Sequence, residues 1–166
     1  MMQQYLIPWI LGVLSMVYAY RIDKNYLRVD FSAIKSFLLF MLWVSLFRAI
    51  TFTVQGGVSV PYLNSINPVT LLGVFSEDAI FVLPLVLLRD KGKLSKFVYA
   101  ILFAISAALF SLGHMYQGLV GFTSIIYLFA SAHFGRKFGF GTVMIGHILY
   151  DFITVAILSI YSIGHL

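Results

Sequence analysis

The sequence predicts an all-α fold, a polytopic membrane bundle of about six transmembrane helices. Hydrophobic residues make up 61% of the 166 residues and charged residues only 10%, and the mean hydropathy is +0.97. A soluble domain of this size does not have such a composition. The apolar residues form runs of roughly 17–25 residues, the length that a helix needs to cross a bilayer. Short connections that carry most of the lysines and arginines separate these runs.

Six apolar runs are candidates for spans. The first is short and contains Pro8, and the second is a long run that contains Arg48. The third contains two adjacent acids, the fourth and fifth meet at a turn near Gln117 and Gly118, and the sixth follows a glycine-rich turn that we expect to be flexible. In chain order the predicted spans are Tyr5–Tyr20, Phe31–Val54, Pro68–Leu88, Leu94–Tyr116, Leu119–Phe134 and Phe140–Ile163.

The basic residues predict the orientation of these spans. Cytoplasmic loops carry an excess of lysine and arginine. The first, third and fifth connections are basic, whereas the other two connections and both termini have no lysine or arginine. This pattern predicts an N-out, C-out protein with three basic loops in the cytoplasm. The basic residues of these loops are Arg21, Lys24, Arg28, Arg89, Lys91, Lys93, Lys96, Arg136 and Lys137.

Composition also limits the domain organisation and the partners. We expect a single integral-membrane domain over residues 1–166, with a motif-bearing core at about 68–163, in a bacterial or archaeal cell membrane. The chain has no cysteine, which excludes disulfides and thiolate metal sites. The net charge is +5, and most of the basic residues lie in the short loops that we expect beside the bilayer. We therefore expect a lipid environment and no nucleic-acid partner.

Five ionisable side chains lie inside the apolar runs: Glu77, Asp78, His114, His147 and Asp151. One charge at the centre of a membrane helix costs about 2.5–3.5 kcal/mol on insertion scales, so these groups need a polar cavity or a partner inside the bundle. His147 and Asp151 are four residues apart and share a helix face. Glu77 and Asp78 point about 100° apart, so one can face a cavity while the other reaches a neighbouring helix.

The economical arrangement brings Glu77, His114 and His147 around one polar pocket. Such a set can hold a water, remove its proton and polarise a carbonyl, and it could also bind zinc. A purely structural polar contact between helices is a further interpretation. Counted from the basic loops, Glu77 and Asp151 fall near mid-membrane but His114 falls near the outer end. The fourth and fifth spans must therefore be tilted, or their turn must be sunk in the bundle.

Three motifs occur in order in these runs. Ser76–Val82 is similar to a Glu-Glu-x-x-x-Arg motif, Phe110–His114 fits Phe-x-x-x-His and is followed by Tyr-Gln-Gly, and His147–Asp151 fits His-x-x-x-Asn/Asp. Together they resemble the motifs of the CPBP (ABI) family, which includes the type II CAAX prenyl endopeptidases. The resemblance covers roughly Leu71 to the C-terminus, and the first two spans carry no motif.

The resemblance implies an intramembrane endopeptidase of the glutamate type that cleaves a membrane-associated polypeptide. Glu77 would be the base that activates water, His114 would position the water, and His147 with Asp151 would hold the oxyanion. The resemblance favours this mechanism, without a cofactor, over a zinc site built from Glu77, His114 and His147. Prenylated C-termini and C-terminal sorting tails are both candidate substrates.

The chain departs from the family pattern at two positions. The second motif acid is Asp78 rather than Glu, and Val82 occupies the position of the motif arginine. Arg48 is the only arginine deep in an apolar run, so we expect its guanidinium to lie near Asp78 or Glu77 as a replacement. Phe110 supports the site from the second motif. An ionised Asp151 cannot donate a hydrogen bond, so it is either protonated or orients His147.

Two other functions are compatible with the residues. A non-catalytic relative with an immunity or scaffold role would bind a membrane peptide without cleaving it, and the missing arginine favours this reading. A small transporter could use the carboxylates as a proton relay, although no duplicated half is present in the sequence.

Overall fold

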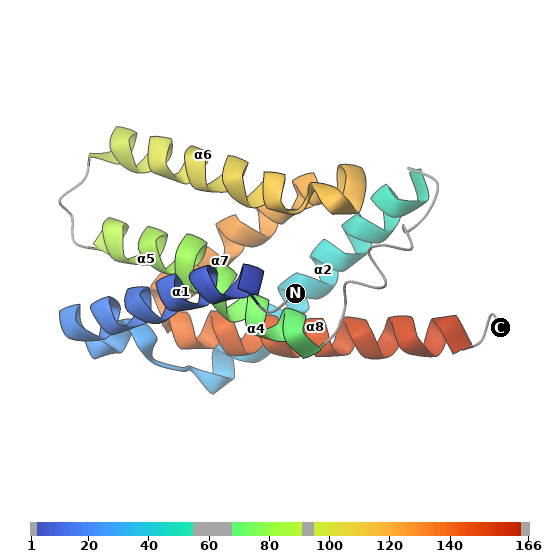
Figure 1. Ribbon diagram of the computed structural model, residues 1–166, viewed down its shortest axis with the longest axis horizontal. Coiled ribbons are helices and arrows are strands. Elements are labelled where there is room, and N and C mark those ends of the chain that lie inside the picture. The colour runs from blue at the N-terminus through green and yellow to red at the C-terminus, as the bar shows by residue number, and fades with distance from the viewer. Residues whose placement is uncertain (1–2, 55–67, 91–94, 164–166) are drawn as a thin grey trace.

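The computed structural model describes residues 3–54, 68–90 and 95–163, and all the regular structure in these ranges is helical (Figure 1). The all-α class is therefore confirmed for the described part of the chain. Within these ranges, seven α-helices are joined by the short 3₁₀ helices η1 (Lys24–Leu27) and η3 (Met115–Thr123) and by a π-helical segment, η2 (Asp78–Val82). The α-helices are α1 (Gln3–Ile22), α2 (Phe31–Val54), α4 (Pro68–Glu77), α5 (Leu83–Asp90), α6 (Lys96–Gly113), α7 (Ser124–Phe138) and α8 (Phe140–Ile163).

The helices follow the six apolar runs closely. The second and sixth predicted spans coincide with α2 and α8, the third contains α4, η2 and α5, and the fifth contains part of η3 and most of α7. Among the described residues, two helical stretches are long and apolar enough to cross a membrane, Phe31–Thr51 and Lys96–Gly113. Two shorter helical stretches are also apolar, Leu6–Ile22 and Phe140–Thr154.

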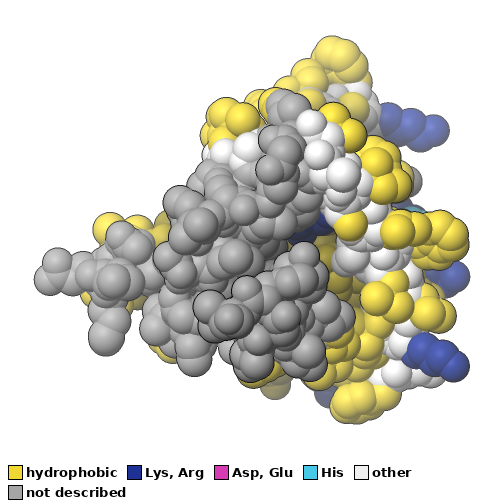
Figure 2. Space-filling model, turned by 90° about the vertical axis from the view of Figure 1, so that its right-hand side faces the viewer, with side chains coloured by type: hydrophobic (Ala, Val, Ile, Leu, Met, Phe, Trp, Pro, Cys, Tyr) yellow, Lys and Arg dark blue, Asp and Glu magenta, His cyan; other side chains and the backbone are white. Residues whose placement is uncertain are grey.

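The two long apolar stretches are not core helices of a globular protein. Only 28% of the apolar stretch of α2 and 17% of that of α6 are buried inside the structure. Large apolar side chains such as Trp43 on α2 and Phe97 on α6 are more than 70% exposed. Hydrophobic side chains also cover much of the described surface when the molecule is viewed from one end (Figure 2). A helix that is apolar towards its surroundings suits a lipid environment better than water.

Local signals in the sequence set the ends of several helices. Asp30 precedes α2, and its Oδ1 accepts hydrogen bonds from the backbone N–H groups of Ser32 (3.0 Å) and Ala33 (3.3 Å). Ser95 caps α6 by accepting a bond from the N–H of Val98 at 3.2 Å. These bonds satisfy donors that the first helical turn leaves free. At its C-terminus, α7 is terminated by Gly139, which has φ +95°, a conformation that favours glycine.

The first basic connection packs against the turn between α7 and α8. The Arg28 guanidinium donates a 2.6 Å bond from Nη2 to the carbonyl of Lys137, and the Asp30 N–H donates to Thr142 Oγ1 at 2.8 Å. A Cβ on Gly139 would lie 2.3 Å from the Arg28 carbonyl oxygen, and one on Gly141 would lie 2.6 Å from that of Leu27. These glycines therefore let two backbones pack in direct contact, and the expected flexibility of the turn stays a prediction.

Helix α7 lies at the centre of the bundle and contacts α2, α5, α6 and α8. Its buried residues pack in one core with Phe37 and Met41 of α2 and with Phe140 and Val143 of α8. The Phe37 ring meets the rings of Phe134 and Tyr127 edge-on, at centroid distances of 5.4 and 6.4 Å. This packing fixes α7 between the helices that carry the three motifs.

The connection between α6 and α7 lies well short of the far ends of α2 and α8 along the long axis (Figure 1). It consists of η3, which contacts α2 as well as α6 and α7. A left-handed Gly118 (φ 71°) breaks the helix there, and a Cβ on Gly121 would lie 2.6 Å from the carbonyl oxygen of His114. The turn therefore packs against three helices, and the depth of His114 in a membrane stays a prediction.

We predict that Gly139→Ala lowers the midpoint of thermal unfolding in detergent by several degrees. The substitution places a side chain at positive φ and drives a Cβ into the Arg28 backbone, and each effect costs on the order of 1–3 kcal/mol. Gly113→Ala is the matched control, because a Cβ at Gly113 meets nothing within 4 Å. Equal midpoints for the two variants would contradict the proposed backbone contact.

Candidate active site

The third apolar run is one continuous helix with a π-helical turn in its middle. The backbone stays helical at both junctions of η2, with φ −61° and ψ −51° at Glu77 and φ −59° and ψ −43° at Leu83. Such turns interrupt the regular α-helical spacing and are frequent at functional sites. At this turn the two acids take different environments: Asp78 is fully buried, whereas the Glu77 side chain is 41% exposed.

Two side chains from two other helices hold the Asp78 carboxylate. The Tyr127 hydroxyl of α7 donates a 2.6 Å bond to Oδ1, and Nδ1 of His147 on α8 lies 3.2 Å from Oδ2. The same Nδ1 lies 2.6 Å from the Tyr127 oxygen. Tyr127 donates its only proton to Asp78. Nδ1 of His147 must therefore be protonated, and its N–H is the donor to both the Tyr127 oxygen and Oδ2 of Asp78. The imidazole is therefore fixed through Nδ1–H.

The other nitrogen of His147 faces a second acid. Its Nε2 lies 3.9 Å from Oδ1 of Asp151, one turn further along α8, and the Asp151 side chain is 32% exposed. This separation is too long for a direct hydrogen bond. His147 thus connects a buried carboxylate on one side with a partly exposed carboxylate on the other.

His114 repeats this arrangement at the end of α6. Its Nδ1 lies 2.8 Å from the carbonyl oxygen of Phe110, which can only accept, so Nδ1 carries a proton here too. Its Nε2 lies 3.8 Å from Oε2 of Glu77, and the His114 side chain is 16% exposed. Both motif histidines are therefore anchored through Nδ1–H and turn Nε2 towards a partly exposed carboxylate.

An aromatic wall joins the two histidines. Phe110 is buried, and its ring centroid lies 4.5 Å from that of His114 and 5.8 Å from that of Tyr127, with which it stacks at 20°. The Tyr127 ring in turn lies 4.3 Å from that of His147, and Phe81 meets Phe110 edge-on at 5.4 Å. Phe110 fixes the spacing between the two imidazoles, which agrees with its predicted supporting position.

Arg48 is half-buried on α2, and it acts electrostatically on His114 and Asp151. The ion pair of Asp78 among the described residues is with His147, and that of Glu77 is with His114. Arg48 therefore lies within the electrostatic field of the site, where its charge acts on His114 and Asp151, and its expected proximity to Asp78 or Glu77 stays a prediction. Val82, at the position of the motif arginine, is fully buried in the apolar core.

The zinc alternative needs three ligands in one cluster. Within the described part of the chain, no group of three His, Asp or Glu side chains is arranged to hold a metal ion. Glu77, His114 and His147 interact in pairs and through their charges, and they do not form a common ligand set. We therefore derive no step through a metal.

Tyr127 is a site residue that was not among those predicted from the sequence. A polar stripe on α7 could have indicated it, because Ser124, Tyr127 and Ser131 follow helical spacing in an otherwise apolar run. All three are buried, and Ser124 donates a bond to the Gly121 carbonyl at 2.5 Å. A buried tyrosine hydroxyl needs a partner, and the partner here is an acid that lies 49 residues away in the chain.

Neither a family profile, nor a curated protein, nor a solved structure gives a significant match to this chain. The three motifs and the contacts among their side chains are therefore the features of this chain that bear on its function.

We predict that Tyr127→Phe destabilises the protein by about 1.5–3 kcal/mol, the range for a hydrogen bond to a charged group. The variant keeps the ring packing but leaves the Asp78 carboxylate without one of its two donors. Tyr18→Phe is the control, because that side chain is 63% exposed. The measurement is thermal or denaturant unfolding in detergent, and equal stability of the two variants would show that the Tyr127 bond does not stabilise Asp78.

Proposed function

We propose that this chain is an intramembrane endopeptidase similar to the CPBP family, with six membrane spans and both termini outside the cytoplasm. The supporting observation for the topology is that the basic connections gather at one end of the bundle. The end of α1, the end of α5, the start of α6 and the turn between α7 and α8 lie together at the left of Figure 1. By the positive-inside rule this end is the cytoplasmic one, in a bacterial or archaeal cell membrane.

One observation carries the proposed activity. Three motif-bearing helical segments bring two histidines together, each fixed through Nδ1–H and each presenting Nε2 to a partly exposed carboxylate at 3.8 or 3.9 Å. Structural polar contacts do not require the Nε2 atoms of both histidines to face accessible acids. Two histidine–carboxylate pairs suit a hydrolase, because one pair can take a proton from water while the other stabilises a developing negative charge.

In the proposed reaction, Glu77 takes a proton from a water that His114 aligns through Nε2. The water oxygen attacks the carbonyl carbon of the scissile peptide bond, and the carbonyl oxygen becomes an oxyanion. His147 as an imidazolium donates from Nε2–H to that oxyanion. When the C–N bond breaks, Glu77 returns the proton to the leaving nitrogen, so that a carboxylic acid and an amine are released.

Asp78 takes a positioning role in this mechanism. It is fully buried and has no open side towards a substrate. Its contact with Nδ1–H favours the charged imidazolium of His147 and fixes the direction of Nε2, as a buried acid does for a catalytic histidine. Tyr127 supports both groups. Asp151 orients the exposed side of His147, and Arg48 balances the negative charge near Asp151.

The substrate that we propose is a polypeptide held at the membrane, such as a prenylated C-terminus or a C-terminal sorting tail. The alternative is a non-catalytic membrane protein that binds such a segment in an immunity or scaffold role. The observation that favours this alternative is Val82, which packs in the apolar core where the motif has an arginine. Measured turnover separates the two proposals.

We predict that Glu77→Gln lowers kcat of the purified protein at least about 100-fold, the lower bound for the loss of general base catalysis. The amide keeps the size of the side chain but cannot accept a proton from water. Asp23→Asn is the control, because it removes a carboxylate outside the site and should leave kcat unchanged. The readout is cleavage of a library of lipid-anchored peptides in proteoliposomes.

The same assay separates the metal-free mechanism from the zinc alternative. We expect a zinc chelator to leave cleavage unchanged. Activity that disappears with the chelator and returns with zinc would overturn the metal-free mechanism. Wild-type turnover in Glu77→Gln would overturn both mechanisms, and a wild-type protein that binds the peptides without cleaving them would support the non-catalytic role.

We further predict that Arg48 is coupled to Asp151. In a double-mutant cycle of Arg48→Gln and Asp151→Asn, the two effects on unfolding free energy should deviate from additivity by at least about 0.5 kcal/mol. The parallel cycle of Arg48→Gln with Asp78→Asn should give a smaller coupling, because His147 already pairs with Asp78. A larger coupling to Asp78 would return Arg48 to the role that the sequence suggested.

A further inference from the structure

A pocket of about 240 Å³ lies between the start of α6 and the second half of α7, apart from the candidate active site. None of its lining residues belongs to the three motifs. The lining consists of Tyr99, Ala100 and Phe103 of α6 and of Phe129, Ala132, His133 and Arg136 of α7. Phe129 is 64% exposed, so the pocket opens to the surroundings of the bundle rather than to its core.

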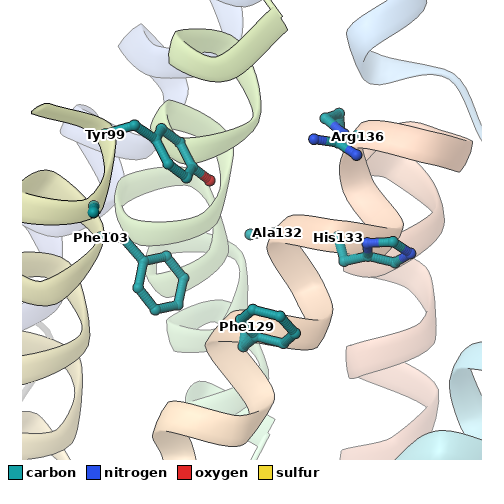
Figure 3. A pocket seen from close by; sticks show the side chains of 7 residues that line it. Tyr99, Phe103, Phe129, Ala132, His133 and Arg136 are labelled. Carbon is teal, nitrogen blue, oxygen red and sulfur yellow. The ribbon is translucent and has the colours of Figure 1, made fainter. Parts of the chain in front are cut away.

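The two ends of this pocket differ in chemistry. Figure 3 shows the hydroxyl of Tyr99 and the guanidinium of Arg136 towards one end, the rings of Phe103 and Phe129 towards the other, and the ring of His133 between them. The two phenyl rings meet edge-on at a centroid distance of 6.0 Å. The pocket is therefore amphipathic and suits a ligand with a polar head and an apolar chain.

The polar end carries a positive charge that no described carboxylate pairs with. Arg136 is half-buried, and no carboxylate among the described side chains forms an ion pair with it. The neighbouring Lys137 lies over the Phe138 ring at 5.0 Å, and the Arg28 guanidinium donates to the Lys137 carbonyl. A cation held at the mouth of a pocket without an acidic partner calls for an anion from outside the described chain.

We propose that this pocket binds an anionic glycerophospholipid. The phosphate lies against Arg136 and the Tyr99 hydroxyl, and one acyl chain runs along Phe103 and Phe129. The inference rests on the membrane placement proposed above but not on proteolysis. Basic pockets between membrane helices on the cytoplasmic side are suited to anionic headgroups. A free anion would leave the phenyl surface of the pocket uncovered, and an apolar chain alone would leave the charge of Arg136 unpaired.

The experiment is a lipid titration followed by native mass spectrometry of the full chain in mild detergent. Phosphatidylglycerol is compared with phosphatidylcholine of the same acyl chains. We expect the wild type to retain phosphatidylglycerol more tightly. Arg136→Gln should weaken that binding about fivefold, which corresponds to about 1 kcal/mol for one arginine near a headgroup. Arg21→Gln, a change of the same kind outside the pocket, should leave binding unchanged.

Two further variants complete the test. Ala100→Phe fills the pocket from the exposed face of α6 and should remove the bound lipid, while Arg136→Lys keeps the charge and should retain most of it. Unfolding midpoints check that each variant is folded, and if Arg136→Gln does not fold, the other two variants decide. Glu77→Gln should bind lipid like the wild type, so a loss of proteolysis and a loss of lipid binding are separate results.

Three outcomes would overturn the proposal. The first is equal retention of the two lipids by the wild type. The second is an equal loss in Arg136→Gln and Arg21→Gln, which would mean general attraction to a basic surface. The third is unchanged lipid binding in Arg136→Gln with a raised KM for the peptide substrate, which would assign the pocket to the polypeptide.

Discussion

The central constraint in this protein is the Asp78 carboxylate, which has no exposed surface in a bundle made mostly of apolar side chains. A buried charge without a partner destabilises a fold by several kcal/mol, so its ligands must be in place. Those ligands come from α7 and α8, and the packing of both helices is therefore tied to α4–η2. His147 is held in one orientation as a consequence, and its free nitrogen has a fixed direction.

Around this fixed centre, burial divides the ionisable groups into two sets. Asp78, Tyr127 and His147 are buried and mutually bonded, while Glu77 and Asp151 keep about a third or more of their side chains exposed. The buried set supplies orientation, and the exposed set is accessible to water and to a ligand. The π-helical turn lets adjacent residues, Glu77 and Asp78, belong to different sets. In a regular α-helix the two side chains would also point in different directions. In this structure they differ in burial as well.

Much of the fold could be predicted from the sequence, because apolar runs bounded by charged loops determine where helices begin and end. The bounds of α2 and α8 follow directly from their runs. The cost of charge in an apolar medium predicted that Glu77 and His114 lie near each other, and one pocket shared with His147 stays a prediction. The role of Tyr127 could not be predicted, because a tyrosine in an apolar run is as compatible with lipid as with a buried acid. The acid that Arg48 faces could not be derived from the sequence, since pairing across helices depends on packing that no periodicity encodes. The rigidity of Gly139 depends on a backbone contact with Arg28, over 100 residues away in the chain.

The distance in sequence between Asp78 and His147 has a consequence for biosynthesis. The two are 69 residues apart, which a ribosome needs about 3–14 s to translate at 5–20 residues per second. During that interval the nascent chain contains the acid but not its cationic partner. In the membrane topology proposed above, the third apolar run would then have to stay close to water or to the insertion machinery until α8 arrives. In that topology, a chain truncated before α8 would keep an unpaired acid in a membrane segment, a feature by which membrane quality control could recognise an unfinished protein.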